Sequence, residues 1–351
     1  MSAITQIEFE DAKQAFQSIL DYGEFPKKSR WLITGAGGFL GSQFLNVLRE
    51  ATRVGFECEV VCLDSQIRGE KREWYFENVT YVCHDVSLPW PELGEFTHVV
   101  HLASIASPVF YREFPLETLQ SNYLGTINAL EYARMSAAKI LLISSSEIYG
   151  DPTPENIPTP ETYRGNVSSI GPRACYDEGK RVLETLSWIY SSKYKMDISV
   201  ARPFNFYGPG MRIDDGRVLP DMFKSFTTNS NIILYSDGKP TRSFCYIRDA
   251  IVSLFVMMLD NKNWKLYNVG NPETEINMSD LASMVARLAR PFGWEQKVVF
   301  EKHEEKDYLV NNPNRRLPST DKIKFELGWT ATVSLEEGIG RSLLHFNELD
   351  S

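Results

Sequence analysis

Short, nearly continuous apolar runs alternate along the amino-terminal half of the chain with segments whose apolar residues recur every three to four positions. The continuous runs lie at 31–34, 58–63, 79–83 and 98–102. Runs of this length without polar alternation predict strands that are buried on both faces. Because helical segments separate them, the pattern predicts an α/β fold with a parallel sheet covered by helices on both sides.

Residues 1–28 precede the first predicted strand. Their apolar positions predict one amphipathic helix packed on the outside of the domain, and these positions are Ile4, Ile7, Phe9, Phe16, Ile19 and Leu20. We assign no chemistry to this helical extension.

A glycine-rich turn joins the first predicted strand to the helix that follows it. Gly35 permits a tight turn, Gly38 lets the backbone approach a pyrophosphate, and Gly41 lets the helix pack closely on the sheet. Unpaired N–H groups at the start of that helix favour phosphate. Strand, turn and helix in this order predict a dinucleotide site, although the glycines alone would also fit an ordinary loop.

Carboxylates follow the second and third predicted strands. Asp64 is placed to accept both ribose hydroxyls of NAD and would repel the 2′-phosphate of NADP. Asp85 is placed to reach the adenine, or alternatively caps its own loop. Ala103 and Ser104 follow the fourth strand and are small enough to let a cofactor lie against the chain. The predicted cofactor is therefore NAD.

Composition and charge exclude several classes of function. A chain of 351 residues is long enough for one large domain or two connected ones. Its net charge of -9 argues against nucleic acid or an anionic membrane as its partner. The five cysteines and five histidines show no metal-ligand spacing, so we predict no metal site and thiols of a reducing compartment. No secretory signal opens the chain, and its longest apolar stretch, at 251–259, is far shorter than the roughly 20 residues of a membrane helix. We expect a cytoplasmic protein.

Tyr176 stands four residues before Lys180. On a helix, both side chains project from one face. A lysine ammonium beside a phenol favours the phenolate, so Tyr176 could act as a base below its ordinary pKa of about 10. Such pairs also arise by chance, and this one gains weight from the dinucleotide motif upstream.

The glycine motif, Asp64 and the Tyr176/Lys180 pair together resemble the extended short-chain dehydrogenase/reductases that act on nucleotide sugars. The resemblance covers about residues 30–349, and its further matching segments are 101–104, 144–152, 201–210 and 242–244. It implies a Rossmann-type doubly wound parallel sheet with a smaller α/β cap that binds the substrate. The NAD-binding domain would comprise 29–205 plus 241–270, and the nucleotide-sugar-binding cap 206–240 plus 271–349.

The resemblance also implies further contacts with the cofactor. Lys180 would hold the nicotinamide ribose, and Tyr176 would lie beside it. The other implied cofactor residues are Phe39, Leu40, Val86, Leu102, Asn122, Ser144 and Pro203.

Residues 145–147 distinguish the activities within this family. The sugar 4,6-dehydratases carry Thr-Asp-Glu, in which the Asp is the acid that expels the C6 hydroxyl and the Glu is the C5 base. This chain has Ser145-Ser146-Glu147. It lacks that acid and resembles the UDP-glucuronate decarboxylases, which carry a hydroxyl residue, Ser and Glu, whereas the 4-epimerases usually lack the Glu. A solvated carboxylate at a strand end is the alternative for Glu147.

The resemblance implies a reaction in which Tyr176 removes the proton of the sugar 4-OH, held by Ser145, while hydride leaves C4 for NAD. Loss of CO2 and re-reduction would then give an NDP-pentose. We expect Glu147 and Arg316 to serve the chemical step after oxidation.

The sugar would contact Tyr111, Ser146 and Arg173, and the diphosphate would be held by Asn205, Arg217 and Arg242. Arg173, Arg217 and Arg316 could instead be solvated charges.

Residues 164–169 and 210–214 depart from the decarboxylase pattern and leave the nucleobase and the exact sugar open. A UDP-sugar is favoured. The alternatives are a 4-epimerase, a 4,6-dehydratase, or a non-catalytic NAD-binding regulator, against which the intact Ser145, Tyr176 and Lys180 argue.

The helix that carries Tyr176 predicts an assembly. It continues through Val182, Leu183, Leu186 and Ile189, with Trp188 and Tyr190 close by. Relatives commonly pair this helix across a two-fold axis, and it carries more apolar surface than one sheet face can cover. We therefore expect a homodimer with an isologous helical interface, the alternative being a monomer whose cap buries these residues.

Overall fold

A parallel sheet forms the centre of the computed structural model, which describes residues 4–67, 77–261, 263–301 and 314–350. It has seven strands in the order β11-β6-β5-β4-β1-β2-β3. The order 3-2-1-4-5-6 within it is that of doubly wound dinucleotide-binding sheets. The strands are β1 (Lys28–Thr34), β2 (Glu57–Asp64), β3 (Val79–Cys83), β4 (His98–His101), β5 (Lys139–Ile143), β6 (Ile198–Pro203) and β11 (Trp264–Val269). The predicted α/β fold class and the positions of the four predicted strands are confirmed. The prediction that all four are buried on both faces is wrong for β3, because this strand lies at the edge of the sheet and none of its residues is buried.

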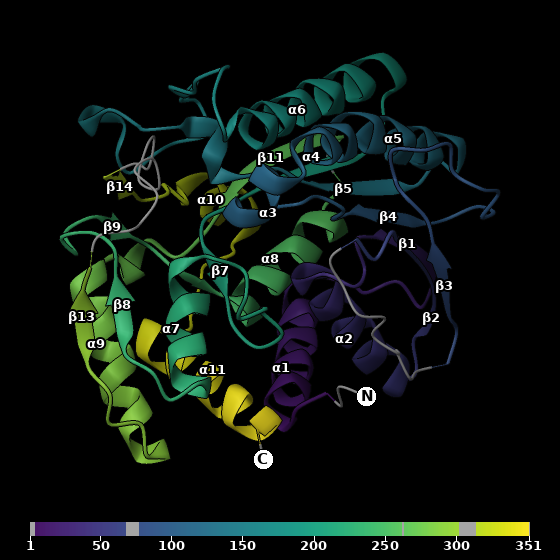
Figure 1. Ribbon diagram of the computed structural model, residues 1–351. Coiled ribbons are helices and arrows are strands. Elements are labelled where there is room, and N and C mark those ends of the chain that lie inside the picture. The colour runs from purple at the N-terminus through teal and green to yellow at the C-terminus, as the bar shows by residue number, and fades with distance from the viewer. Residues whose placement is uncertain (1–3, 68–76, 262, 302–313, 351) are drawn as a thin grey trace.

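Helices cover both faces of this sheet (Figure 1). One face carries α1 (Gln6–Tyr22), α2 (Phe39–Arg53) and α8 (Ile247–Leu259). The other carries α4 (Pro115–Gln120), the π-helical turn η1 (Ser121–Gly125), α5 (Thr126–Met135) and α6 (Ala174–Tyr194).

The continuous apolar character of the strands follows from this double cover. Successive side chains of β1 enter different cores, because residues along a strand alternate between its faces. Trp31 and Ile33 pack in the core that includes α1, α2 and α8, whereas Leu32 packs in the core beneath α5 and α6.

Further elements gather at the end of the molecule where β6 and β11 lie (Figure 1). Their helices are α7 (Val218–Thr227), α9 (Met278–Ala289) and α11 (Leu335–Asp350). Their strands are β8 (Ile232–Leu234), β9 (Thr241–Arg242), β12 (Ile276–Asn277), β13 (Val298–Phe300) and β14 (Arg315–Arg316). Val285 of α9 and Ile339 of α11 belong to the same hydrophobic core as Ile33 of the sheet. This region therefore shares a core with the sheet.

Shorter elements complete the described chain. They are α3 (Pro108–Glu113), β7 (Phe206–Tyr207), β10 (Cys245–Tyr246), α10 (Asp321–Leu327) and the 3₁₀ turns η2 (Ser146–Tyr149), η3 (Pro154–Asn156), η4 (Pro272–Thr274) and η5 (Arg290–Phe292). In the part of the chain that the structure describes, no helix has the length and hydropathy that a bilayer crossing requires.

The helix predicted within residues 1–28 is α1, and it is bound more deeply than predicted. It packs against α2, α8 and α11, so it is not simply attached to the outside of the domain. Its side chain Asp11 is buried, accepts a hydrogen bond from the Tyr246 hydroxyl and pairs with Arg341 at 2.9 Å. A buried ion pair of this kind fixes one orientation of the helix, because an unpaired charge there would be costly.

Candidate active site

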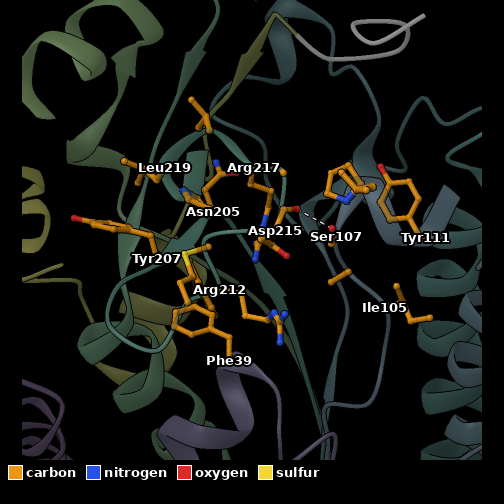
Figure 2. A pocket seen from close by; sticks show the side chains of 18 of the residues that line it. Phe39, Ile105, Ser107, Tyr111, Asn205, Tyr207, Arg212, Asp215, Arg217 and Leu219 are labelled. Carbon is orange, nitrogen blue, oxygen red and sulfur yellow. Dashed lines mark hydrogen bonds and ion pairs between the residues drawn. The ribbon is translucent and has the colours of Figure 1, made fainter. Parts of the chain in front are cut away.

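A cavity of 1110 Å³ opens between the carboxyl ends of the strands and the region around α7 (Figure 2). In doubly wound sheets this is where ligands bind. Twenty-four of the twenty-five residues singled out from the sequence as site residues line it. On the cofactor side these are Gly35, Gly38, Phe39, Leu40, Gly41, Asp64, Asp85, Val86, Leu102, Ala103, Ser104, Ser144, Tyr176, Lys180 and Pro203. The others are Tyr111, Ser145, Ser146, Glu147, Arg173, Asn205, Arg217, Arg242 and Arg316.

Asn122 lies outside this cavity. Its side-chain amide donates to the Thr118 carbonyl at 2.8 Å, and its Cβ stands 3.1 Å from where a Cβ on Gly179 would lie. The absence of a side chain at Gly179 lets Asn122 pack between η1 and α6. The predicted contact of Asn122 with the cofactor therefore has no support here.

The turn before α2 requires glycine at two positions. Gly35 has φ +67°, and a Cβ there would lie 2.7 Å from the backbone nitrogen of Ala103. At Gly41 a Cβ would lie 2.5 Å from the carbonyl oxygen of Gly35. The first glycine thus permits the close approach to the segment after β4, and the second lets α2 start against the turn.

The carboxylate of Asp64 faces this glycine turn. It accepts hydrogen bonds from the backbone N–H of Gly37 at 2.9 Å and of Gln66 at 2.8 Å. Asp85 accepts from both the N–H and the hydroxyl of Ser87, each at 2.8 Å. The alternative prediction for Asp85, a loop cap, is therefore confirmed, while its side chain also lines the cavity.

Tyr176, Lys180 and Ser145 meet in the cavity wall. Tyr176 and Lys180 lie one turn apart on α6 and are buried, and Ser145 follows β5. The Lys180 ammonium lies 5.6 Å from the centre of the Tyr176 ring and donates to the Ile143 carbonyl at 2.7 Å. Tyr111 stacks on Tyr176, with ring centres 5.4 Å apart.

Burial dominates the titration of this pair. It raises the pKa of Tyr176 to about 12, although the hydrogen bond with Ser145 acts in the lowering direction. Burial also lowers the pKa of Lys180 to about 7. The expectation that Lys180 brings the pKa of Tyr176 below its ordinary value is therefore wrong. Burial disfavours the charged phenolate more strongly than the neighbouring side chains favour it.

Glu147 stands at the centre of a cluster of charges. Arg173 and Arg316 both donate hydrogen bonds to its carboxylate. Their side chains are only 14% and 5% exposed, so the alternative of solvated surface charges is wrong for both. Burial acts to raise the pKa of Glu147, but the charges of Arg316 and Arg173 lower it to about 2. Glu147 is thus a carboxylate at neutral pH.

Asp177 extends this cluster behind Arg173. Its carboxylate lies 3.7 Å from Nε of Arg173. Burial, together with the negative charge of Glu147, raises the pKa of Asp177 to about 7. Two carboxylates therefore share the positive charges of Arg173 and its neighbours, and the one nearer to both guanidinium groups keeps its charge.

Further polar side chains that could bind an anionic ligand line the cavity. The amide of Asn205 donates to the Ser243 carbonyl at 2.8 Å, and Arg217 pairs with Asp215. Arg242 donates to the Thr241 carbonyl at 2.8 Å, and burial followed by the charge of Arg316 lowers its pKa to about 10. Arg217 is the most exposed of the three predicted substrate arginines at 37% of its side chain, but it too faces the cavity.

Among the lining residues that sequence reasoning missed, Ser107 and Asp215 are joined by a hydrogen bond. The hydroxyl of Ser107 donates to the backbone carbonyl of Asp215 at 2.7 Å, which joins the segment before α3 to the segment before α7 (Figure 2). Asp215 stands two residues before Arg217, which was singled out, but no role was expected of Asp215 itself. Nothing in the sequence around Ser107 indicated this contact.

Comparison with known proteins agrees with this geometry. The sequence pattern of the NAD dependent epimerase/dehydratase family matches residues 31–270. UDP-glucuronic acid decarboxylase 3 of Arabidopsis thaliana is 40% identical over 314 residues, which are 88% of this chain and 86% of that protein.

Solved structures share the fold. The epimerase Mth375 of Methanothermobacter thermautotrophicus superposes with a TM-score of 0.79 at 24% identity, over 95% of this chain and 96% of that one. MoeE5, solved with UDP-glucuronic acid and NAD, gives a TM-score of 0.72 at 21% identity, over 91% and 99%. With its sheet order, its glycine turn and these matches, the chain belongs to the NAD-dependent epimerase/dehydratase family.

Proposed function

We propose that this protein is an NAD-dependent NDP-glucuronate decarboxylase, with UDP-glucuronate as the favoured substrate. The observation that carries the proposal is the placement of Glu147, held by Arg173 and Arg316, in one cavity with Tyr176 and Ser145. This set combines groups for oxidising a sugar hydroxyl with groups for handling a carboxylate. The likeness to the Arabidopsis decarboxylase over most of both chains supports it.

The residues on the cofactor side fit NAD. The glycine turn leaves space for a pyrophosphate, since a Cβ on Gly38 would meet only the Gly35 carbonyl, at 3.2 Å. Asp64 is held at the end of β2 beside that turn, where it would accept the hydroxyls of the adenosine ribose. When bound, NAD supplies the acceptor for a hydride from C4 of the sugar and the donor that returns it.

Tyr176 would exchange the proton of the sugar 4-OH, while Ser145 holds that hydroxyl and the phenol together. The hydrogen bond with Ser145 favours the phenolate against burial. Lys180, fixed by the Ile143 carbonyl, places its amino group on the same face of α6. General-base catalysis of this kind contributes about 10²–10⁴-fold in rate.

Loss of CO2 needs a suitable geometry more than it needs an acid. Once C4 is a ketone, the carboxylate on C5 is β to a carbonyl, and its bonding electrons can pass into that carbonyl as CO2 leaves. The cavity must then turn the carboxylate out of the carbonyl plane and stabilise the enolate. The carboxylate of Glu147 would repel the substrate carboxylate, and Arg316 and Arg173 would stabilise the negative charge that develops.

Ser146 argues against the dehydratase alternative. It is buried in the cavity wall between Ser145 and Glu147. At this position a dehydratase of the family carries the acid that expels the C6 hydroxyl, and a serine hydroxyl is a poor proton donor. Elimination of water from C6 would therefore lack its acid.

The test is to incubate the purified protein with UDP-glucuronate and, separately, with UDP-glucose, dTDP-glucose and UDP-galactose. We expect release of CO2 and an NDP-pentose from the first, and no 4-keto-6-deoxy sugar from the hexoses, by mass spectrometry. Ser146→Asp tests the same point, with a trace of water loss as the expected gain. If the wild type instead removed water from a hexose efficiently, the protein would be a 4,6-dehydratase. If it inverted C4 of a hexose, it would be a 4-epimerase.

The assembly and compartment belong to the same proposal. A homodimer is supported by the exposed apolar side chains of α6, among them Trp188 and Ile189. A reducing compartment such as the cytoplasm is supported by the five cysteines, all of which are free thiols.

A further inference from the structure

Helices from the two ends of the chain meet behind one wall of the cavity. Thr5 caps α1, and its hydroxyl lies 2.8 Å from Nδ1 of His345 on α11. The other ring nitrogen, Nε2, accepts a hydrogen bond from the backbone N–H of Gly210 at 3.2 Å. A nitrogen that accepts carries no proton, so His345 here is neutral and donates from Nδ1 to Thr5. His345 is 3% exposed, which keeps water out of this bridge.

The bridge ends on a segment that forms part of the cavity wall. Residues 208–212 follow β7, and Met211 and Arg212 line the cavity (Figure 2). The amide of Gln43 on α2 also donates to the Pro209 carbonyl, at 2.9 Å. The segment is therefore held between α11 and the helix that begins at the glycine turn.

Gly210 makes this fit tight. It has φ +83°, and a Cβ there would lie 2.9 Å from the side-chain nitrogen of Gln43 and 3.2 Å from a carboxylate oxygen of Glu8 on α1. A glycine is thus required both by its backbone conformation and by the approach of α1 and α2. Glu8 is itself buried and bonded to the N–H of Thr5 at 3.2 Å, so the cap of α1 and the segment share one packed unit.

Two features of the sequence fall at the same place. The run 210–214 is one of the two at which this chain departs from the pattern of the decarboxylases. The helices that hold it, α1 and α11, both lie outside residues 31–270, which match the family. Part of the wall of the substrate cavity is therefore held by helices that lie outside residues 31–270.

We propose that His345, together with Thr5, is a positioning residue that sets the affinity for the nucleotide sugar by holding 208–212 against the cavity. Helix α1 then has a part in substrate binding, although its sequence indicated no chemistry. The identity of the ligand rests on the proposed function, but the role of His345 applies to whichever nucleotide sugar the cavity accepts.

The experiment compares four variants of the full chain. His345→Ala removes the acceptor of Gly210, His345→Gln keeps an amide oxygen that can replace it, and Thr5→Val removes the hydroxyl without changing the shape. Ile19→Ala is the matched control, because this buried side chain stabilises the docking of α1 at its other end. The KM and kcat for UDP-glucuronate are measured, and the dissociation constant is measured by calorimetry in a Tyr176→Phe background.

We expect His345→Ala to raise KM and the dissociation constant about tenfold, as for loss of one buried hydrogen-bond acceptor. Its kcat at saturation should stay within about twofold, Thr5→Val should show a smaller rise in KM, and His345→Gln should recover most of the affinity. Ile19→Ala should lower the melting temperature and leave KM unchanged.

Equal KM values for His345→Ala and the wild type, or an equal rise in KM for His345→Ala and Ile19→Ala, would overturn the positioning role. If the wild type does not convert UDP-glucuronate but converts another nucleotide sugar, the result contradicts the proposed function and not the positioning role of His345. The same variants are then measured with that sugar.

Discussion

At the scale of single residues, burial and charge drive the ionisable groups of the cavity in opposite directions. Burial raises the pKa of Tyr176 to about 12 and lowers that of Lys180 to about 7. Glu147, although partly buried, has a pKa lowered to about 2 because two guanidinium groups bond to it. At neutral pH the phenol of Tyr176 is therefore protonated, whereas Glu147 is ionised. Groups whose pKa values are pushed apart in this way are typical of sites that move protons.

Tyr176→Phe removes the proton-exchanging hydroxyl and leaves the ring that stacks on Tyr111. We expect kcat for CO2 release to fall by about 10²–10⁴-fold or more. The cofactor should remain bound, because the cavity wall around Lys180 and Asp64 is unchanged; its amount is measured by chromatography after extraction. A correctly folded variant with near wild-type turnover would remove Tyr176 from the mechanism.

The raised pKa of Asp177 gives a stability prediction with a definite sign. Its pKa is about 7 in the folded chain and near its ordinary 3.8 in the unfolded chain, so the folded state holds this proton more tightly. The stabilisation from that proton is complete below about pH 4 and is lost as pH rises through about 7. Asp177→Asn cannot ionise, so its melting temperature relative to the wild type should rise between pH 4.5 and 7.5.

The control for this prediction is Asp321→Asn, at an exposed carboxylate at the start of α10. Its melting temperature should follow that of the wild type over the same pH range. Parallel curves for Asp177→Asn and the wild type would mean that Asp177 titrates normally.

At the scale of elements, sequence reasoning placed the strands correctly because they depend on local patterns. Twenty-four of the twenty-five site residues that it singled out line the cavity, and many of these were implied by the family resemblance. The run Val79–Cys83 is apolar and bounded by polar residues, and it forms β3 with those limits. The depth at which α1 is bound could not be predicted, because its buried face includes the charged Asp11, whose partner Arg341 lies at the other end of the chain. The contact of Ser107 with the Asp215 carbonyl was hidden for the same reason.

Asp64 lies where the end of β2 meets the glycine turn. Because the Gly37 N–H holds its carboxylate at 2.9 Å, the charge is fixed where a 2′-phosphate would lie. We expect NAD to support turnover far better than NADP, and Asp64→Ala to narrow that preference. The ratio of kcat/KM for the two cofactors checks this, and a wild type that prefers NADP would contradict the ribose assignment.

Glu147 and Arg316 couple η2 to β14 across the cavity. Glu147→Gln and Arg316→Ala should lose CO2 release while affinity for the UDP portion, measured by calorimetry with UDP, stays close to that of the wild type. Both variants break a charged cluster, so both should also melt at lower temperature, since a partly buried charge is left without its partner. Loss of UDP affinity together with turnover would instead assign the pair to nucleotide binding.

At the scale of the whole molecule, helix α6 lies on the side opposite α11 (Figure 1). Trp188 is 58% exposed and Ile189 41%, so in the described chain the cap does not cover them, contrary to the monomer alternative. Helix α4 packs beside α6 and exposes Leu116 at 69% and Leu119 at 40%. Adjacent helices that expose large apolar side chains together form the kind of patch that marks an interface.

A two-fold axis would place this patch against its own copy, as expected of an isologous dimer. Sedimentation at micromolar concentration should therefore give a species of about twice 40.1 kDa. Trp188→Glu should shift it towards the monomer, because the dimer would bury that charge without a partner. Leu349→Glu is the matched control, since that side chain is 49% exposed at the end of α11. A wild type that sediments as a single species near 40.1 kDa, or a dimer that Leu349→Glu disrupts as strongly as Trp188→Glu, would exclude this face as the interface.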